Sequence, residues 1–195
     1  MDNILVLYYS SGGSTKQLAQ LIARGVEKQG LEAVIRTVPR ISANHQATES
    51  EIPSDGDCYV TLDELSNCSG LAVGSPSRFG NMAAPLKYFI DQTSEQWMTG
   101  KLAGKPVSFF SSSSSMHGGQ ETTLLSMMIP FLHHGMLIVG LPYSETELLR
   151  TESGGTPYGV THWNGHENNR AISEVEKSLA IAQGKRLAIL AKKLN

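Results

Sequence analysis

ILVLYYSSGGST, residues 4–15, is the stretch that decides the fold. Residues 4–9 are apolar without alternation, which is typical of a strand buried on both faces of a parallel sheet. Residues 10–14 form a Ser/Gly loop, and residues 32–38 show a second strand pattern. Between them, apolar residues recur at helical spacing and stop before Gly30; they are Leu18, Leu21, Ile22 and Val26. This order predicts a βαβ unit with a right-handed crossover.

The same alternation continues along the chain. Further strands are predicted over 71–74, 107–110 and 136–139, and helices over 82–92, around 124–132 and at the C-terminal end. Pro130 is expected to kink or shorten the second of these helices, because proline cannot donate to the helical ladder. Ser173 and Glu176 have the spacing of a capping box before the last helix.

Five strands alternating with helices predict an α/β fold, a doubly wound five-stranded parallel sheet in three layers, as a single domain over residues 1–195. Residues 39–66 and 141–172 are polar and longer than ordinary connections. We expect such stretches to be functional or interface loops, and the second to be a long insertion near the last strand.

Composition excludes several classes of protein. Hydrophobic residues make up 40% and charged residues 17% of the 195 residues, which indicates a folded globular chain. The formal net charge of −2 favours neither nucleic acid nor an anionic membrane as a partner. Cys58 and Cys68 lack CxxC spacing and a nearby histidine pair, so we expect free thiols and no metal site. Without a leader or a long apolar run, a cytoplasmic protein without membrane insertion is expected.

Ligands of such sheets bind outside the carboxyl ends of the strands, where three unusual loops are predicted. The first, residues 10–15, offers hydroxyls and backbone N–H groups at a helix N-terminus, which favours an anion. It lacks both the G-x-G-x-x-G and the G-x-x-x-x-G-K-[ST] spacing, so a phosphate monoester held by neutral donors fits better than a dinucleotide or a nucleoside triphosphate. The alternative is an ordinary turn that caps a helix.

The other two loops suit a flat ligand. Residues 74–82 place Arg78 and Phe79 between glycines directly after a strand, so backbone N–H groups could reach the oxygens of a ring. Residues 111–119 are small and polar, which lets a ligand approach the backbone closely. The alternatives are a solvated arginine beside a packed phenylalanine, and a flexible serine linker.

Several motifs together resemble the WrbA-type NAD(P)H:quinone oxidoreductases, a flavodoxin-like family. They are GSPSRFGNMAAPLKYFIDQT (74–93), HGGQETTLLS (117–126), HHGMLIVGLPY (133–143), GGTPYGVT (154–161) and AQGKRLA (182–188), together with the loop after the first strand. The resemblance covers nearly the whole chain and is weakest over 41–65 and 163–172. It implies FMN as cofactor, NADH or NADPH and a quinone as substrates, and a homotetramer.

The resemblance also implies site residues. The phosphate loop would be Ser10, Ser11, Gly12, Gly13, Ser14 and Thr15; the isoalloxazine would lie between Ser77, Arg78, Phe79 and Gly80 on one side and Ser112, Ser113, Ser114, Ser115, Met116, His117 and Gly118 on the other. His133 would lie near the flavin as a catalytic residue, and Trp97 would border the quinone pocket. Family members commonly carry an aromatic residue where Gly12 stands, and tend to have Thr and Gly at positions 116 and 117.

The resemblance leads us to expect an exchange in two steps. NAD(P)H delivers a hydride to the flavin and leaves, and a quinone then enters on the same face, so kinetics should be ping-pong. Quinone reduction needs protons, and histidine is the side chain that titrates near neutral pH, which would suit His133; Trp97 would form an apolar wall. Without the resemblance, His133 would be interpreted as a solvated or capping residue, and Trp97 as a core aromatic. Two other functions stay open: a one-electron flavodoxin, although those are usually strongly acidic, and a non-enzymatic module that binds a regulator.

Overall fold

The computed structural model describes residues 2–41 and 53–194. Its centre is a parallel sheet in the order β2-β1-β3-β4-β5, with β6 paired to β4. The strands are β1 (Asn3–Tyr8), β2 (Glu32–Thr37), β3 (Gly70–Pro76), β4 (Pro106–Ser113), β5 (Leu137–Ile138) and β6 (Val160–Trp163). The predicted doubly wound parallel sheet is therefore confirmed.

β5 and β6 share one position in the sheet. β5 pairs with the start of β4, where Pro106 faces Leu137, and β6 pairs with its end, where Phe110 faces Val160. The five predicted strand positions are thus present, and the predicted insertion enters between two halves of the fifth. β6 itself was not predicted.

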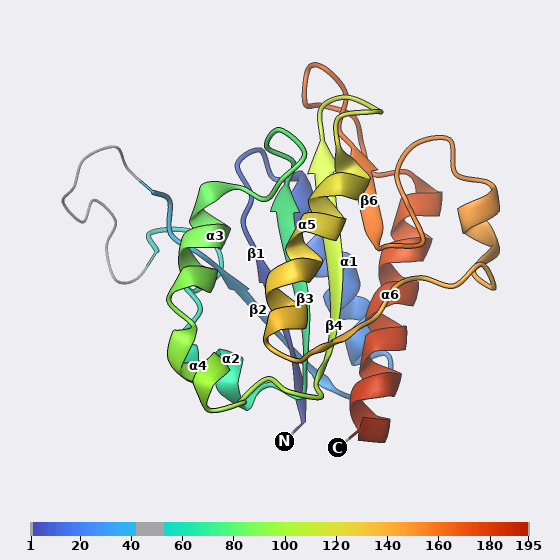
Figure 1. The fold of residues 1–195 in the computed structure, drawn as a ribbon. Helices are drawn as coiled ribbons and strands as arrows, with labels where there is room; N and C mark the ends of the chain where they lie inside the picture. The colour runs from blue at the N-terminus through green and yellow to red at the C-terminus, as the bar shows by residue number, and fades with distance from the viewer. Residues whose placement is uncertain (1, 42–52, 195) are drawn as a thin grey trace.

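Helices cover both faces of the sheet, which gives the three predicted layers (Figure 1). α1 (Ser14–Glu27) and α6 (Glu174–Leu194) pack on one face and share one apolar cluster. α3 (Ala84–Asp91) and α5 (Gln120–His133) pack on the other face and share a second cluster. Three short helices were not predicted: α2 (Leu62–Asn67), α4 (Ser94–Met98) and the 3-10 helix η1 (Thr146–Leu149).

Two glycines let α1 and α6 approach closely. A Cβ atom at Gly184 would overlap the backbone carbonyl oxygen of Ile22, and one at Gly25 would overlap that of Ile181. Because each glycine faces the backbone of the other helix, both helices can lie flat on the same face of the sheet.

Two of the differences from the predicted elements have a clear structural basis. β4 was expected to end at Phe110, but it continues through three buried serines to Ser113, because β6 supplies the ladder partners that a serine run requires. α5 runs through Pro130 to His133, so this proline does not shorten the helix. The predicted capping box is confirmed: the backbone N–H of Ser173 donates to Glu176, and that of Glu176 donates to Ser173 Oγ at 3.2 Å.

In the part of the chain that the structure describes, every helix is too short or too polar to cross a membrane.

Candidate functional site

A pocket of about 680 Å³ opens at the carboxyl ends of β1, β3 and β4, at the upper end of the sheet in Figure 1. The three predicted loops contribute residues 10–12 and 14–15, 76–79, and 112–115 with Gly118. A fourth segment, after β6, contributes Asn164 and Asn168. The structure therefore brings the three loops into one cavity.

One end of the pocket is the N-terminus of α1. The first intrahelical hydrogen bond runs from Gln17 N to Gly13 O, so the N–H groups of Ser14, Thr15 and Lys16 precede the ladder. Gly13 is the N-cap with φ +90°, and no side chain caps the helix. The first turn holds no acidic residue. This end therefore offers backbone donors, hydroxyls and the positive end of a helix dipole to an anion.

Hydroxyl contacts fix the shape of this end. Ser10 Oγ accepts from the backbone N–H of Gly13 at 3.0 Å, which closes the loop. Thr15 Oγ1 lies 3.0 Å from Ser112 Oγ, which joins the loop after β1 to the end of β4. The shape of this end of the pocket is thus set by both strands rather than by one turn alone.

The other end of the pocket presents Arg78 and Phe79. The Arg78 guanidinium donates to Ser11 Oγ at 2.9 Å, so it bridges the first and second loops. Phe79 is fully exposed and has φ +53°, a left-handed conformation that non-glycine residues seldom adopt. A large apolar side chain held in a strained backbone beside a cavity indicates a ligand-binding position.

Two glycines allow the second and third loops to touch. Gly80 has φ +76° and Gly119 has φ +80°, and a Cβ at Gly119 would lie 2.7 Å from the Cα of Gly80. Ser77 Oγ donates to the carbonyl of Gly118 at 2.9 Å across the same gap. Glycine is required here both for the backbone angle and for the close approach.

Side chains that were not predicted as site residues support the third loop. Gln120 Nε2 donates to Ser113 Oγ at 2.9 Å, and Trp163 Nε1 donates to the carbonyl of Ser114 at 3.2 Å. The Arg170 guanidinium lies 4.1 Å from the centre of the Trp163 ring, within the range of a cation–π contact. The segment after β6 therefore supports the pocket wall.

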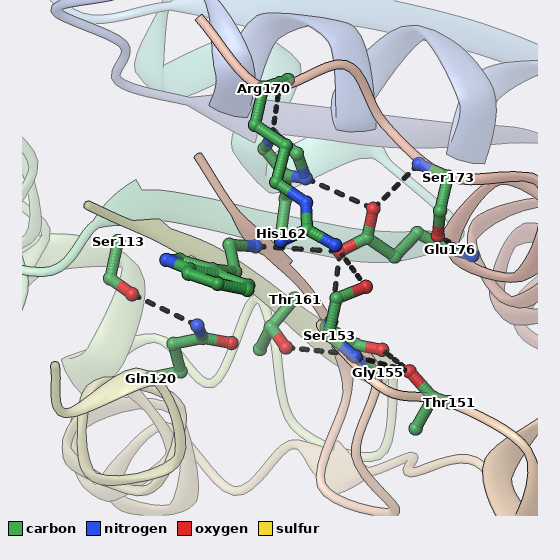
Figure 2. Close-up of polar contacts among 12 residues, drawn as sticks. Ser113, Gln120, Thr151, Ser153, Gly155, Thr161, His162, Arg170, Ser173 and Glu176 are labelled. Carbon is green, nitrogen blue, oxygen red and sulfur yellow. Dashed lines mark hydrogen bonds and ion pairs between the residues drawn. The ribbon is translucent and has the colours of Figure 1, made fainter. Parts of the chain in front are cut away.

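A buried polar cluster anchors that segment, and Figure 2 shows it centred on Glu176. Glu176 is fully buried, and its carboxylate accepts from the backbone N–H groups of Gly154 and Ser173 and from Ser153 Oγ. It also contacts His162 Nδ1 at 3.1 Å. Burial alone would raise the pKa of Glu176, but these hydrogen bonds outweigh it and lower the pKa to about 2.

His162 faces an acceptor on each side of its ring. Nδ1 lies 3.1 Å from the Glu176 carboxylate, and Nε2 lies 3.1 Å from the carbonyl of Arg170. Each of these two atoms can accept a hydrogen bond from a ring N–H group. The cluster therefore joins β6, the insertion and the start of α6.

Five predicted cofactor residues do not line the pocket: Gly13, Gly80, Met116, His117 and His133. Gly13 and Gly80 act through the backbone, as the α1 cap and as the turn against Gly119. Met116 and His117 lie exposed at the tip of the third loop. Conversely, Pro76, Asn164 and Asn168 line the pocket without having been predicted, and the two asparagines follow a strand that carried no sequence signal.

Trp97 and His133 lie in another part of the structure. They line a second pocket of about 520 Å³ between α3, α4 and α5. This pocket shares no lining residue with the first. The two rings stack, with their centroids 5.4 Å apart. Within one chain, these residues form a pair in a pocket that also includes Asn81 and Met82 of the second loop, but they do not line the first pocket.

The donor set of the first pocket fits FMN. Neutral hydroxyls and free N–H groups suit a phosphate monoester, while Arg78, Phe79 and the closely packed glycine loops suit a flat ring. A volume of about 680 Å³ is within the range of small-ligand pockets. The described residues would therefore hold this cofactor without rearrangement of the sheet.

A doubly wound parallel sheet with an uncapped first helix and a ligand pocket at its carboxyl edge defines a flavodoxin-like protein. Solved structures agree: a WrbA-like flavodoxin from Agrobacterium tumefaciens aligns with a TM-score of 0.70 and 20% identity over 100% of both chains. A flavodoxin from the Archaea aligns with a TM-score of 0.66 and 18% identity, over 97% of this chain and 99% of its own.

The chain belongs to the NADPH-dependent FMN reductase family, whose model matches residues 3–146. It is also 40% identical over 200 residues to a protein of Solidesulfovibrio magneticus called NAD(P)H dehydrogenase (quinone), and the match covers 98% of each chain. These matches confirm the resemblance that the sequence motifs indicated.

Proposed function

We propose that this protein is an FMN-dependent oxidoreductase that reduces quinones by two electrons at the expense of NADH or NADPH. The observation that carries the proposal is the pocket at the strand ends, where an uncapped helix N-terminus faces an exposed, strained Phe79. The family match and the name of the 40% identical relative support both the cofactor and the substrates.

In this proposal the loop after β1 binds the phosphate. The N–H groups of Ser14 to Lys16 and the hydroxyls of Ser10 and Thr15 surround it without a basic side chain. Arg78 and Phe79 hold one side of the ring, and the third loop holds the other. The flavin supplies the redox chemistry, accepting a hydride and passing two electrons on, and the protein supplies orientation.

We further propose that the site is completed by assembly into a homotetramer. Trp97 is half exposed, His133 is exposed, and both lie apart from the loops that would hold the ring. In an assembly, this pair of one subunit could face Phe79 of another. Trp97 would then be an apolar wall for a quinone, and His133 a proton donor to its oxygen.

We propose that nucleotide and quinone use the same face in turn, which gives ping-pong kinetics. Parallel lines in double-reciprocal plots at several quinone concentrations would support this order, and intersecting lines would contradict it. A cytoplasmic location is proposed as well, supported by two cysteines that are both free thiols.

The test is an absorbance titration of a single sample. The absorbance of the purified apoprotein is followed after addition of FMN, then NADH or NADPH, then benzoquinone. FMN uptake, bleaching by the nucleotide and recovery of the absorbance by the quinone would establish the activity. FMN uptake without bleaching would indicate an electron carrier, and no uptake would contradict the proposal. Light scattering of the same sample tests the tetramer.

A further inference from the structure

A second cavity adjoins the flavin pocket at its phosphate end. Its volume is about 560 Å³, and it shares Gly12, Ser14, Asn164 and Asn168 with the flavin pocket. It runs along the side of α1, where Ser14, Gln17, Leu21 and Arg24 recur at helical spacing. Ten residues of helix span about 15 Å, so the cavity is a trough that leads away from the phosphate loop.

The wall between the two cavities is open at Gly12. A Cβ at this position would meet no atom within 4 Å, and its φ is not in the left-handed region. The rest of the wall is formed by the asparagine pair, in which Asn164 Nδ2 donates to Asn168 Oδ1 at 2.9 Å. A group bonded to the outer side of a phosphate at α1 could therefore pass directly into the trough.

Among the described residues, those that line the trough include three cations and no carboxylate. Arg24 comes from α1, Arg170 from the segment after β6 and Lys177 from α6. Arg170 is positioned by its contact with the Trp163 ring, and Lys177 is paired with Glu174 outside the lining. At least two positive charges are thus available for an anionic group.

The trough also has features that suit a nucleoside. Leu21 and Ile172 contribute an apolar surface, and Gln17, Gln20 and Asn169 contribute amides that can donate and accept. A flat base can pack on this apolar surface, and the edge of the base or a ribose can form hydrogen bonds with these amides. A volume of about 560 Å³ is within the range of pockets for small ligands.

The cavity on the other side of the phosphate loop differs in charge. It has a volume of about 460 Å³ and includes Asp55 and Asp57, and the latter accepts from Tyr8 Oη at 2.7 Å. These two carboxylates offset the two cations of its lining, Lys16 and Arg40, so a second phosphate there would meet no net positive charge. Of the two cavities described beside this loop, the trough along α1 combines an open wall at the phosphate with a net positive lining.

We propose that this trough binds the adenosine monophosphate half of FAD, so that the protein accepts FAD as well as FMN. The inference rests on the proposed flavin site. The shared wall lies at the phosphate loop, whereas Arg78 and Phe79, at the ring end, do not line the trough. This arrangement favours a nucleotide joined to the flavin phosphate over one that must stack on the flavin ring.

In this arrangement the phosphate next to the flavin remains bound at the N-terminus of α1. The second phosphate lies beyond Gly12, where the trough begins, and the adenosine follows along Leu21 and Ile172 in the trough that Arg24 and Arg170 also line. Arg24 is exposed and makes no contact with the flavin pocket, so its removal should affect FAD and spare FMN.

The test measures dissociation constants of FMN and FAD for the apoprotein by quenching of flavin fluorescence. The variants are Arg24→Gln, Arg24→Gln combined with Arg170→Gln, and Arg186→Gln, an exposed α6 residue outside the trough that removes the same charge. Each exposed cation contributes modestly, so we expect FAD binding to weaken about threefold in the first variant and about tenfold in the second. FMN binding in the first variant, and both flavins in Arg186→Gln, should stay unchanged.

The outcomes separate this inference from the proposed function. FMN uptake with no FAD uptake would overturn the inference and leave the function standing. FAD binding that is equally strong in all variants would also overturn it, because the adenylate would then lie outside the trough. Uptake of neither flavin would overturn the proposed function, and the inference with it. Far-ultraviolet circular dichroism of each variant confirms that it is folded.

Discussion

Replacing Glu176 by glutamine removes the charge at the centre of the buried cluster and leaves its shape nearly unchanged. The carboxylate contacts the His162 ring and accepts from Ser153, Gly154 and Ser173. An amide at this position offers one acceptor oxygen in place of two and turns two donors toward the remaining N–H groups. The variant therefore leaves buried donors without an acceptor, which costs about 1 to 3 kcal/mol for each such group.

The pKa of Glu176 gives the size of the effect. It falls from an ordinary value of 4.5 to about 2 in the folded protein. Each pKa unit corresponds to about 1.4 kcal/mol, so at neutral pH the charged form stabilises the fold by about 3 kcal/mol. For a chain of this size, that corresponds to a decrease of about 6 to 12 °C in Tm.

The pH dependence has a defined sign. Because the folded pKa lies below the unfolded one, the stabilisation is fully present above pH 4.5 and is lost as the pH falls towards 2. At pH 3 about half of it should remain. The difference between the wild type and Glu176→Gln should therefore narrow on acidification.

Urea unfolding followed by tryptophan fluorescence, at pH 7 and pH 3, measures both effects. Glu174→Gln is the matched control, because this residue lies in the same first turn of α6 but is exposed and paired only with Lys177. Its loss should cost less than about 1 kcal/mol. Equal losses in the two variants at pH 7, or a gap that does not change with pH, would refute the reasoning.

Three further predictions concern packing and thiol access. Gly119→Ala should lower the unfolding free energy by about 1 to 3 kcal/mol and weaken FMN binding, because φ is +80° and the new Cβ would lie 2.7 Å from the Cα of Gly80; urea unfolding and a flavin titration check this. Gly184→Ala should destabilise the apoprotein by about 2 kcal/mol or more by forcing α6 away from α1, and unchanged urea unfolding would contradict it. Exposed Cys58 should react with Ellman's reagent at once and Cys68 only on unfolding, because burial raises its pKa to about 11; two equally fast thiols would contradict this.

The elements that could be predicted carry their signal locally. The run 4–9, the loop after it and the apolar spacing of α1 each form a pattern within a few turns of chain, and β1 and α1 are found there. The capping box of α6 is another local signal. Element order then determines the sheet, because crossovers are right-handed and strands pair in parallel.

The elements that were missed depend on distant partners. β6 is four residues long and becomes a strand only because the exposed ladder of β4 lies beside it. The serines at the end of β4 do not resemble a buried strand, yet two of them find hydrogen-bond partners in neighbouring elements: Ser112 contacts Thr15, and Ser113 contacts Gln120. Neither partner is recognisable before the fold brings it there.

The candidate site shows the same difference between features with a local sequence signal and features that depend on distant partners. Topology predicts that loops after parallel strands meet, so the three loops could be predicted to share one cavity, and they do. Asn164 and Asn168 arrive through the insertion, and their position depends on β6. Trp97 and His133 came from the resemblance alone, and the fold of one chain places them in another pocket. The role that we propose for them would therefore require the proposed assembly, which a single sequence does not encode in a readable pattern.

Glu176 links the last helix to the cofactor site. As the acidic partner of Ser173 in the capping box, Glu176 stabilises the start of α6. As the partner of His162 it holds β6 and, through the carbonyl of Arg170, the segment that borders both cavities. A residue with only a capping role would affect the helix alone. Because the same carboxylate fixes both, loss of its charge should loosen the wall at Asn164 as well as destabilise the fold. Flavin binding should in turn recover part of the stability that Glu176→Gln loses, since a ligand that binds only the folded state stabilises it by mass action.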